Sequence, residues 1–188
     1  MTIEIFSMLD ADTILVTQGE MFISCDPNVI MTTLVGSCIS ACMFDSVARI
    51  GGMNHFLLPD GSEISATSRL SYGFYAMECL INGLVKQGAM KSRLCCKLFG
   101  GANIRANLGD IGTRNATFAT DFLNSEGISC VCSSLGGDRG RRIRFWPATG
   151  RAQQLMIRDD NIANREMETA RKDLLRRRDS AAQEVEFF

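Results

Sequence analysis

The sequence predicts a mixed domain of the α/β (α+β) class, in which two helices pack on one β-sheet. Two stretches carry apolar residues at helical spacing and stop at glycines, namely Tyr72 to Gly88 and Gly112 to Ser125. Short apolar, strand-like runs precede, separate and follow them. The hydrophobic content of 46% and charged content of 22% are ordinary for a globular protein. A chain of 188 residues then suits one domain with a sizeable core.

The predicted strands are short and separated by turn residues. They are Thr13 to Thr17, Glu20 to Ser24, Cys38 to Asp45, Ile50 to Leu57, Arg93 to Phe99, Ile128 to Ser133, Arg142 to Trp146 and Arg151 to Ile157. The segment Asn28 to Val35 fits a short helix as well as a strand, and Asp160 to Ser180 predicts a charged helix.

Charge is unevenly distributed along the chain. Residues 139–178 hold twelve Lys or Arg against five Asp or Glu, and the last ten residues hold three acids and no base. A basic segment suits an anionic partner, although solvated helix faces are the commoner reason for arginines. Aromatic residues are sparse and no known nucleic-acid reader motif is present, so we expect no nucleic-acid partner.

The eight cysteines fit a reduced, cytoplasmic protein better than a disulfide scaffold, which belongs to much shorter secreted chains. The sequence shows no secretory signal and no apolar run of transmembrane length. No C-x-x-C pair occurs, so we expect no metal site. Cys130 and Cys132 would share one face of a strand, and burial is the expected explanation for both.

A thiol and the only histidine supply the candidate chemistry. Cys38 and His55 lie in two strand-like runs joined by Ser46 to Arg49, which is short enough for a hairpin. With a symmetric turn, the residue numbers of two paired residues add up to about 95, so that His55 faces Ser40 across the hairpin. Cys38 lies on the same face as Ser40, because it is two residues away on the strand. The two side chains are then diagonal neighbours, whereas a slip of one residue would put them on opposite faces. A thiol beside an imidazole can perform acyl transfer, but a buried core histidine and a buried cysteine explain the same pattern.

Glycines beside both residues favour the catalytic interpretation. Gly36 and Ser37 precede Cys38 and form a small, turn-capable approach whose backbone N–H groups would line an oxyanion hole. Gly51-Gly52 before His55 indicates close backbone approach within a strand.

Several separate motifs, in this order, resemble the CheD family of chemoreceptor glutamine deamidases. They are Gly36-Ser37-Cys38, Gly51-Gly52-Met53-Asn54-His55-Phe56-Leu57-Leu58-Pro59, Tyr75-Ala76-Met77-Glu78, Lys97-Leu98-Phe99-Gly100-Gly101-Ala102 and Gly136-Gly137-x-x-Gly140-Arg141. The resemblance runs from about Asp12 to Ile157. It divides the chain into a deamidase domain, residues 1–157, and a charged C-terminal helix with an acidic, aromatic tail, residues 158–188.

The resemblance implies a single-domain, three-layer sandwich with a mixed β-sheet, similar to the catalytic domains of bacterial deamidating toxins. It implies that selected glutamines on the cytoplasmic helices of methyl-accepting chemoreceptors are hydrolysed to glutamate, without a cofactor and without membrane insertion. By this resemblance the nucleophile of the family corresponds to Cys38 and its base to His55. The third residue of the catalytic set, a threonine, corresponds to Thr32. Gly36, Ser37 and Asn54 are candidates for oxyanion or substrate contacts, and a structural turn role suits Ser37 and Asn54 equally.

A second hypothesis belongs to another functional class. Relatives in the family also bind the CheC-type CheY-phosphate phosphatase, so a member without turnover would act as an adaptor for receptors and that phosphatase. Retention of Thr32, Cys38 and His55 together favours the enzyme. A general cysteine hydrolase of small amides is the weaker third alternative, because no feature of the sequence indicates a small-molecule pocket.

Overall fold

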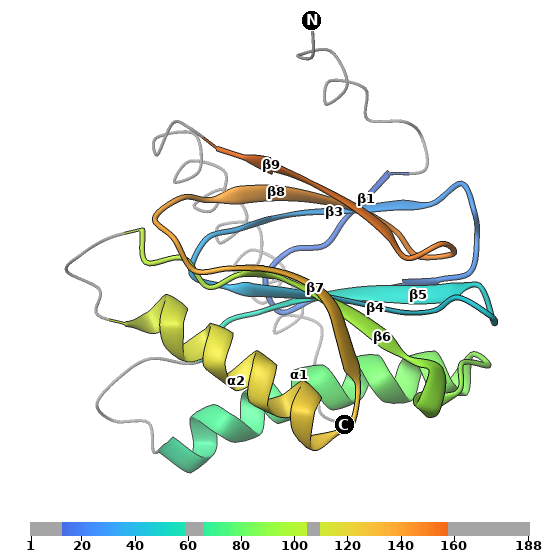
Figure 1. Ribbon diagram of the computed structural model, residues 1–188, viewed down its shortest axis with the longest axis horizontal. Helices are drawn as coiled ribbons and strands as arrows, with labels where there is room; N and C mark the ends of the chain where they lie inside the picture. Colours follow the sequence, from blue (N-terminus) through green and yellow to red (C-terminus); the bar gives the residue numbers. More distant parts are fainter. Residues whose placement is uncertain (1–12, 59–65, 105–109, 158–188) are drawn as a thin grey trace, which may run out of the picture.

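The chain forms three layers, a four-stranded sheet over a five-stranded sheet over two helices (Figure 1). The computed structural model describes residues 13–58, 66–104 and 110–157. The three-layer arrangement of mixed strands and helices confirms the predicted fold class. The helix expected at Asp160 to Ser180, and with it the whole of residues 158–188, lies outside the described residues.

The five-stranded sheet forms the middle layer and has the order β2-β5-β4-β6-β7. Its pairs are antiparallel except β6 with β7, which run parallel. Its strands are β2 (Met21–Ser24), β4 (Ile39–Asp45), β5 (Ile50–Phe56), β6 (Cys95–Gly100) and β7 (Ser129–Leu135). Nearly every residue of β4 and β5 is buried, because both faces of these central strands are covered.

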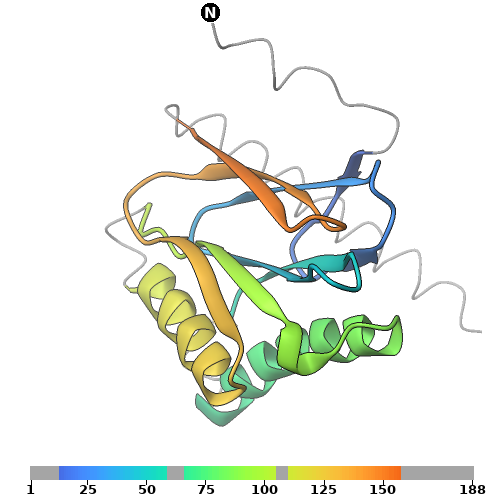
Figure 2. The ribbon, with the colours of Figure 1, turned by 45° about the vertical axis from the view of Figure 1, so that its right-hand side comes forward.

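The four-stranded sheet has the order β1-β3-β8-β9 and covers one face of the middle layer (Figure 2). Its strands are β1 (Thr13–Leu15), β3 (Ile30–Val35), β8 (Arg141–Trp146) and β9 (Arg151–Met156). The ambiguous segment before Gly36 is therefore a strand. In β8 buried residues alternate with partly exposed ones, as expected for an outer layer with one covered face.

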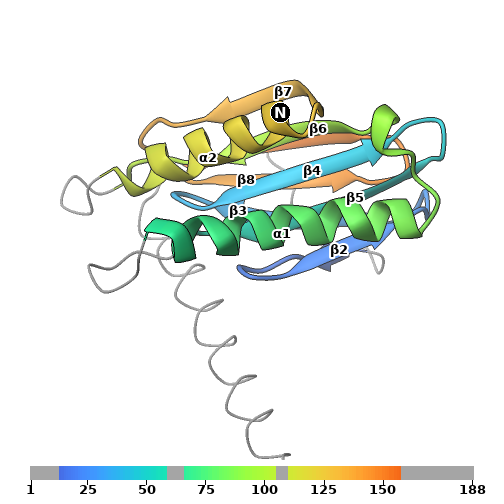
Figure 3. The same cartoon turned by 90° about the horizontal axis from the view of Figure 1, so that it is seen from below.

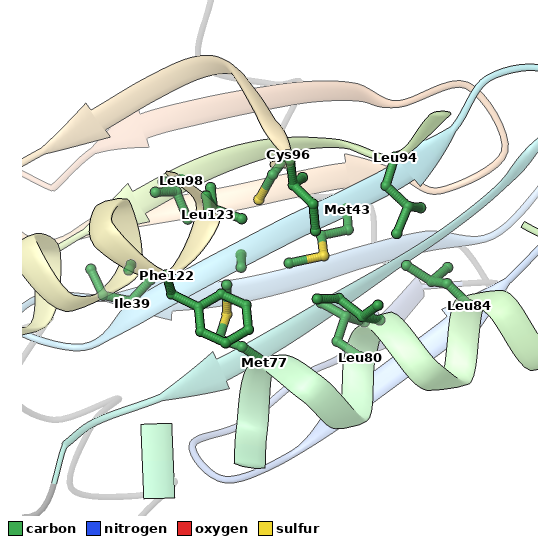
Figure 4. Packing of buried hydrophobic residues seen from close by; sticks show 14 of the residues in the cluster. Ile39, Met43, Met77, Leu80, Leu84, Leu94, Cys96, Leu98, Phe122 and Leu123 are labelled. Carbon is green, nitrogen blue, oxygen red and sulfur yellow. The ribbon is translucent and has the colours of Figure 1, made fainter. Parts of the chain in front are cut away.

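Both helices, α1 (Ala66–Lys86) and α2 (Ile111–Ser125), lie across the other face of the five-stranded sheet (Figure 3). They turn Met77, Leu80 and Phe122 towards apolar side chains of the sheet (Figure 4). The helices pack on one sheet, as predicted, but the order of elements did not reveal that the strands divide into two sheets. A short 3-10 helix, η2 (Lys91–Arg93), was also not predicted.

Two apolar cores result from this layering. One fills the space between the helices and the five-stranded sheet, and the other fills the space between the two sheets. Cys38 and Met53 belong to the second core. The close approach expected at Gly51 is confirmed, since a Cβ there would lie 2.5 Å from the carbonyl oxygen of Pro147, next to the opposing sheet.

The β4–β5 hairpin has the predicted register, with Ser40 opposite His55 and Asp45 opposite Ile50. Fully buried Asp45 holds its turn. One carboxylate oxygen accepts the N–H groups of Val47 and Ala48, each at 3.0 Å. The other accepts Nε of Arg93 at 2.9 Å and the N–H of Met90 at 3.0 Å. Burial alone would raise the pKa of Asp45, but these hydrogen bonds, led by Arg93, hold it well below its usual range.

The expected burial of Cys130 and Cys132 is wrong, because both are exposed. They lie on β7, the edge strand of the five-stranded sheet, where five consecutive residues from Ser129 are exposed. An edge strand lacks a neighbour on one side, and residues 129–133 stay exposed although α2 contacts this strand. The apolar character of the local sequence therefore did not indicate a core position.

Replacing Asp45 tests the turn. We expect Asp45→Ala to lower the free energy of unfolding by about 3 kcal/mol at pH 7, because buried N–H groups and the Arg93 guanidinium lose their acceptor. Urea denaturation measures this loss, and Asp138→Ala, at an exposed ion pair with Arg139, is the matched control. Since the folded pKa of Asp45 is lowered, its stabilisation is present above the ordinary carboxyl pKa and shrinks as pH falls below it. Equal stability of wild type and Asp45→Ala at pH 7 would contradict this role.

Candidate active site

His55 is held by one well-defined hydrogen bond on its ring. The hydroxyl of Thr33 lies 2.9 Å from Nδ1 of His55 and donates its own proton to the carbonyl of Val16 at 2.6 Å. Since its proton is used there, the hydroxyl accepts from Nδ1–H, which leaves Nε2 without a proton. Nε2 is buried and has no hydrogen-bond partner among the described residues. A neutral imidazole with a free lone pair is the form that a general base requires.

Burial keeps this imidazole neutral. The ring is 7% exposed, and desolvation lowers the pKa of His55 to about 4, although the backbone of Val16 and the charge of Glu20 act in the opposite direction. The imidazole of His55 is therefore unprotonated across the neutral pH range.

Cys38 lies one residue before β4 and is 2% exposed. Its Sγ donates to Oε1 of Gln18 at 3.6 Å. Burial raises the pKa of the Cys38 thiol to about 12, against a smaller lowering by its own backbone N–H. At neutral pH the resting residue is a thiol rather than a thiolate.

The register brings Cys38 and His55 to the same face of the middle sheet, as the sequence predicted. His55 pairs with Ser40, and Cys38 precedes Ser40 by two residues, so both side chains point into the layer between the sheets. Transfer of the thiol proton to Nε2 would leave the site without net charge, and the resulting opposite charges attract. The pair can thus generate a nucleophile during a reaction without holding a charge at rest.

The backbone before β4 is held by the connection that follows β6 and by a side chain of α2. Three successive carbonyls, those of Gly36, Ser37 and Cys38, accept hydrogen bonds from the N–H of Ala102 at 2.8 Å, Nδ2 of Asn115 at 3.1 Å and the N–H of Gly101 at 2.9 Å. In a planar peptide the next N–H points opposite to each carbonyl. The N–H groups of Ser37 and Cys38 therefore point away from that connection, as donors for an oxyanion must.

Gly100 permits this close approach, because it has a φ of +116° and any Cβ would overlap the Cys38 carbonyl. Arg141 anchors the same connection from β8. Its side chain is almost fully buried and donates to the carbonyl of Gly100 at 3.2 Å, and also to the carbonyls of Ser134 and Gly136. The Gly-rich segment ending at Arg141 is thus part of the support of the Cys38 backbone.

A turn over residues 17–20 lies beside the site and is hydrogen-bonded to the backbone of His55. The N–H of Gly19 donates to the carbonyl of His55 at 2.7 Å, and the N–H of His55 donates to the carbonyl of Glu20 at 3.0 Å. The Glu20 carboxylate closes the turn by accepting both the N–H and the hydroxyl of Thr17.

Comparisons with known proteins place the chain in a family. The family model described as CheD chemotactic sensory transduction matches residues 57–156. A protein of Caulobacter sp. (strain K31) is 54% identical over 147 residues, covering 78% of each chain. One of Agrobacterium fabrum is 52% identical over 139 residues, covering 74% of this chain and 77% of the relative. The chain belongs to the CheD family.

Both CheD relatives carry the name "Probable chemoreceptor glutamine deamidase CheD". A solved structure of a Neisseria meningitidis protein of the DUF152 family is only distantly similar, with a TM-score of 0.44 and 10% sequence identity. The match covers 67% of this chain and 64% of that one. The CheD family match begins two residues after His55, so the roles of Cys38 and His55 rest on the geometry of the site.

The CheD resemblance assigned the third position to Thr32, but the structure places Thr33 at the ring. The Thr32 hydroxyl donates to the carbonyl of Ile143 at 2.8 Å, since neighbouring residues of a strand point to opposite faces. Thr33 shares its face with Met31 and Val35, which are fully buried. In the sequence alone each threonine lies between two apolar residues on its own face of the strand, so alternation did not show which of them meets the ring.

Among the other sequence candidates, Gly36 and Ser37 lie at the site and Asn54 does not. Asn54 faces α1, where its side chain accepts the N–H of Ala41 at 3.1 Å and donates to the carbonyl of Ala76 at 3.0 Å. Its contacts are therefore structural. Sequence reasoning missed Gln18, Asn115 and the role of Arg141, whose contacts join segments far apart in the chain.

In the described part of the CheD domain, no cluster of three or more His, Cys, Asp or Glu side chains is arranged to hold a metal ion. None of its helices is both long enough and apolar enough to cross a membrane.

The two threonines make a matched pair for mutation. We expect Thr33→Val to reduce turnover about 10-fold to 100-fold, because the ring loses the acceptor that fixes its tautomer. Thr32→Val, which removes a hydroxyl from the same strand but not from the ring, should change turnover by less than about threefold. Steady-state kinetics with each variant measures both effects. A larger loss in Thr32→Val than in Thr33→Val would reverse the assignment.

Proposed function

We propose that this chain is a chemoreceptor glutamine deamidase, with Cys38 as nucleophile and His55 as general base and acid. The observation that carries the proposal is the free, buried Nε2 of His55, on the same face as the Cys38 thiol and fixed in its tautomer by Thr33. The names of the relatives, which are about half identical to this chain, supply the substrate class.

The reaction follows from these positions. Nε2 of His55 takes the thiol proton as Sγ attacks the carboxamide carbon of a substrate glutamine. The oxyanion that forms lies near the N–H groups of Ser37 and Cys38. The imidazolium then gives its proton to the departing nitrogen, ammonia leaves and a thioester remains. His55 deprotonates a water molecule that attacks the thioester, which releases glutamate and returns the proton to the thiolate.

The closed, neutral resting site fits this order of events. Because burial raises the pKa of Cys38 to about 12, very little of the residue is a thiolate at pH 7. The nucleophile is therefore formed by proton transfer to His55 during the attack rather than stored as an ion pair. A nucleophile kept as a buried thiol is also protected from oxidation between turnovers.

The proposed substrates are glutamines on the cytoplasmic helices of methyl-accepting chemoreceptors, which would place the protein in the cytoplasm. A CheC-type phosphatase partner and an adaptor role remain predictions from the sequence resemblance. No contact in the described residues favours the adaptor over the enzyme, and a thiol–imidazole pair with a fixed tautomer has no use in a binder.

Mass spectrometry of a chemoreceptor cytoplasmic fragment incubated with the protein tests the proposal. We expect Gln-to-Glu conversion at discrete positions, reduced at least about 10³-fold in Cys38→Ala and in His55→Ala. Cys42→Ala is the matched control, because Cys42 is a buried thiol in the same layer but lies farther along β4. Conversion that survives in Cys38→Ala would contradict the nucleophile. Binding of the fragment without conversion by wild type would favour the adaptor.

A further inference from the structure

The side chain that touches the Cys38 thiol has no role in the mechanism above. Oε1 of Gln18 accepts a hydrogen bond from Sγ at 3.6 Å. Gln18 is an exposed residue and Cys38 a buried one, so this carboxamide lies between the nucleophile and the surface. A polar group at this position is among the first that an incoming substrate carboxamide would meet.

The backbone that carries Gln18 is fixed independently of any substrate. Gln18 belongs to the turn of residues 17–20, in which the N–H of Glu20 donates to the carbonyl of Thr17 at 3.0 Å. The turn is joined to the base by the two backbone hydrogen bonds between His55 and residues Gly19 and Glu20. The carboxamide is therefore carried by a backbone segment that is hydrogen-bonded to His55, while its own terminal torsion can still turn.

A carboxamide can serve both states of the nucleophile. Its oxygen accepts from the resting thiol, and its nitrogen carries two N–H donors on a terminal torsion that is broad and roughly two-fold. Once the thiol proton has moved to His55, the sulfur is an anion without a proton to donate. A half-turn of the Gln18 amide then presents N–H to the sulfur, and the substrate oxyanion develops within about 3 Å of that sulfur.

We propose that Gln18 is a further catalytic residue, whose side-chain N–H joins the backbone N–H groups of Ser37 and Cys38 in stabilising the thiolate and the oxyanion. This proposal rests on the deamidase function proposed above. It adds a donor from the turn between β1 and β2, a segment separate from the one that holds the Cys38 backbone.

A competing role has the opposite consequence for rate. The Gln18 carboxamide has the same functional group as the proposed substrate, so it would also fit as an internal mimic that blocks the thiol. Removal of a blocking group accelerates turnover, whereas removal of an oxyanion donor slows it.

The test uses the full-length protein and a chemoreceptor cytoplasmic fragment, with kcat and KM for Gln-to-Glu conversion measured by mass spectrometry. We expect Gln18→Ala and the near-isosteric Gln18→Met to lower kcat by about 10-fold to 10³-fold, with KM within about twofold of wild type. Gln18→Glu should lower kcat further, because a carboxylate cannot donate and repels the developing anion. Gln87→Ala, at the carboxyl end of α1, is the control and should match wild type.

Two additional measurements separate catalysis from folding and from thiol access. Because Gln18 is exposed, the urea midpoint of each variant should equal that of wild type. Iodoacetamide should still alkylate Cys38 in Gln18→Ala, but no faster than in wild type, because the thiolate loses a donor. Continued alkylation would show that the thiol is intact while turnover is lost, whereas faster alkylation is the result expected of a blocking group.

An unchanged kcat in Gln18→Ala, with Cys38→Ala inactive, overturns the role of Gln18 and leaves the deamidase standing. A higher kcat in Gln18→Ala overturns it in favour of the internal mimic. Conversion that persists in Cys38→Ala, or none by wild type, overturns the proposed function and the role of Gln18 with it.

Discussion

The pairing of Ser40 with His55 across β4 and β5 is the constraint on which the site depends. It sets which face of the middle sheet carries the imidazole, and Cys38 reaches that face only because it precedes Ser40 by an even number of residues. The buried carboxylate of Asp45 defines the turn that sets this register, and it does so by hydrogen bonds to two segments of the chain. A charged group outside the site thus supports the register that brings Cys38 and His55 to one face.

The three-layer packing determines the protonation states of Cys38 and His55. Because the middle sheet is covered on both faces, Cys38 and His55 are both desolvated, and burial favours the neutral form of each. Thr33 determines which ring nitrogen of His55 is free. The connection after β6 and Asn115 of α2 hold the carbonyls of Gly36, Ser37 and Cys38. Both groups are neutral at rest, and in the proposed reaction charge would develop only as the thiol attacks a substrate carboxamide.

Much of this arrangement was readable in the sequence, because it depends on local periodicity. The hairpin register followed from the length of the turn, and the helices followed from their apolar spacing. Strand alternation would also have turned Asn54 away from His55. It could not choose between Thr32 and Thr33, because each lies between two apolar residues on its own face of β3. By contrast, Gln18 and Asn115 contact residues 20 and 78 positions away in the chain. Arg141 supports the site indirectly, by binding the carbonyl of Gly100. The exposure of Cys130 on an edge strand and the division into two sheets likewise depend on which strands become neighbours, which local pattern does not encode.

The protonation state of His55 tests the central claim most directly, because it is the only histidine in the chain. Long-range ¹H–¹⁵N correlation spectra of the uniformly ¹⁵N-labelled protein, without a histidine tag, report the protons on both ring nitrogens across a pH titration. We expect a neutral ring with the proton on Nδ1 and a bare Nε2, which becomes charged only near pH 4. A proton on Nε2 at neutral pH, or a titration midpoint at or above that of a free imidazole, would contradict a buried base held ready by Thr33.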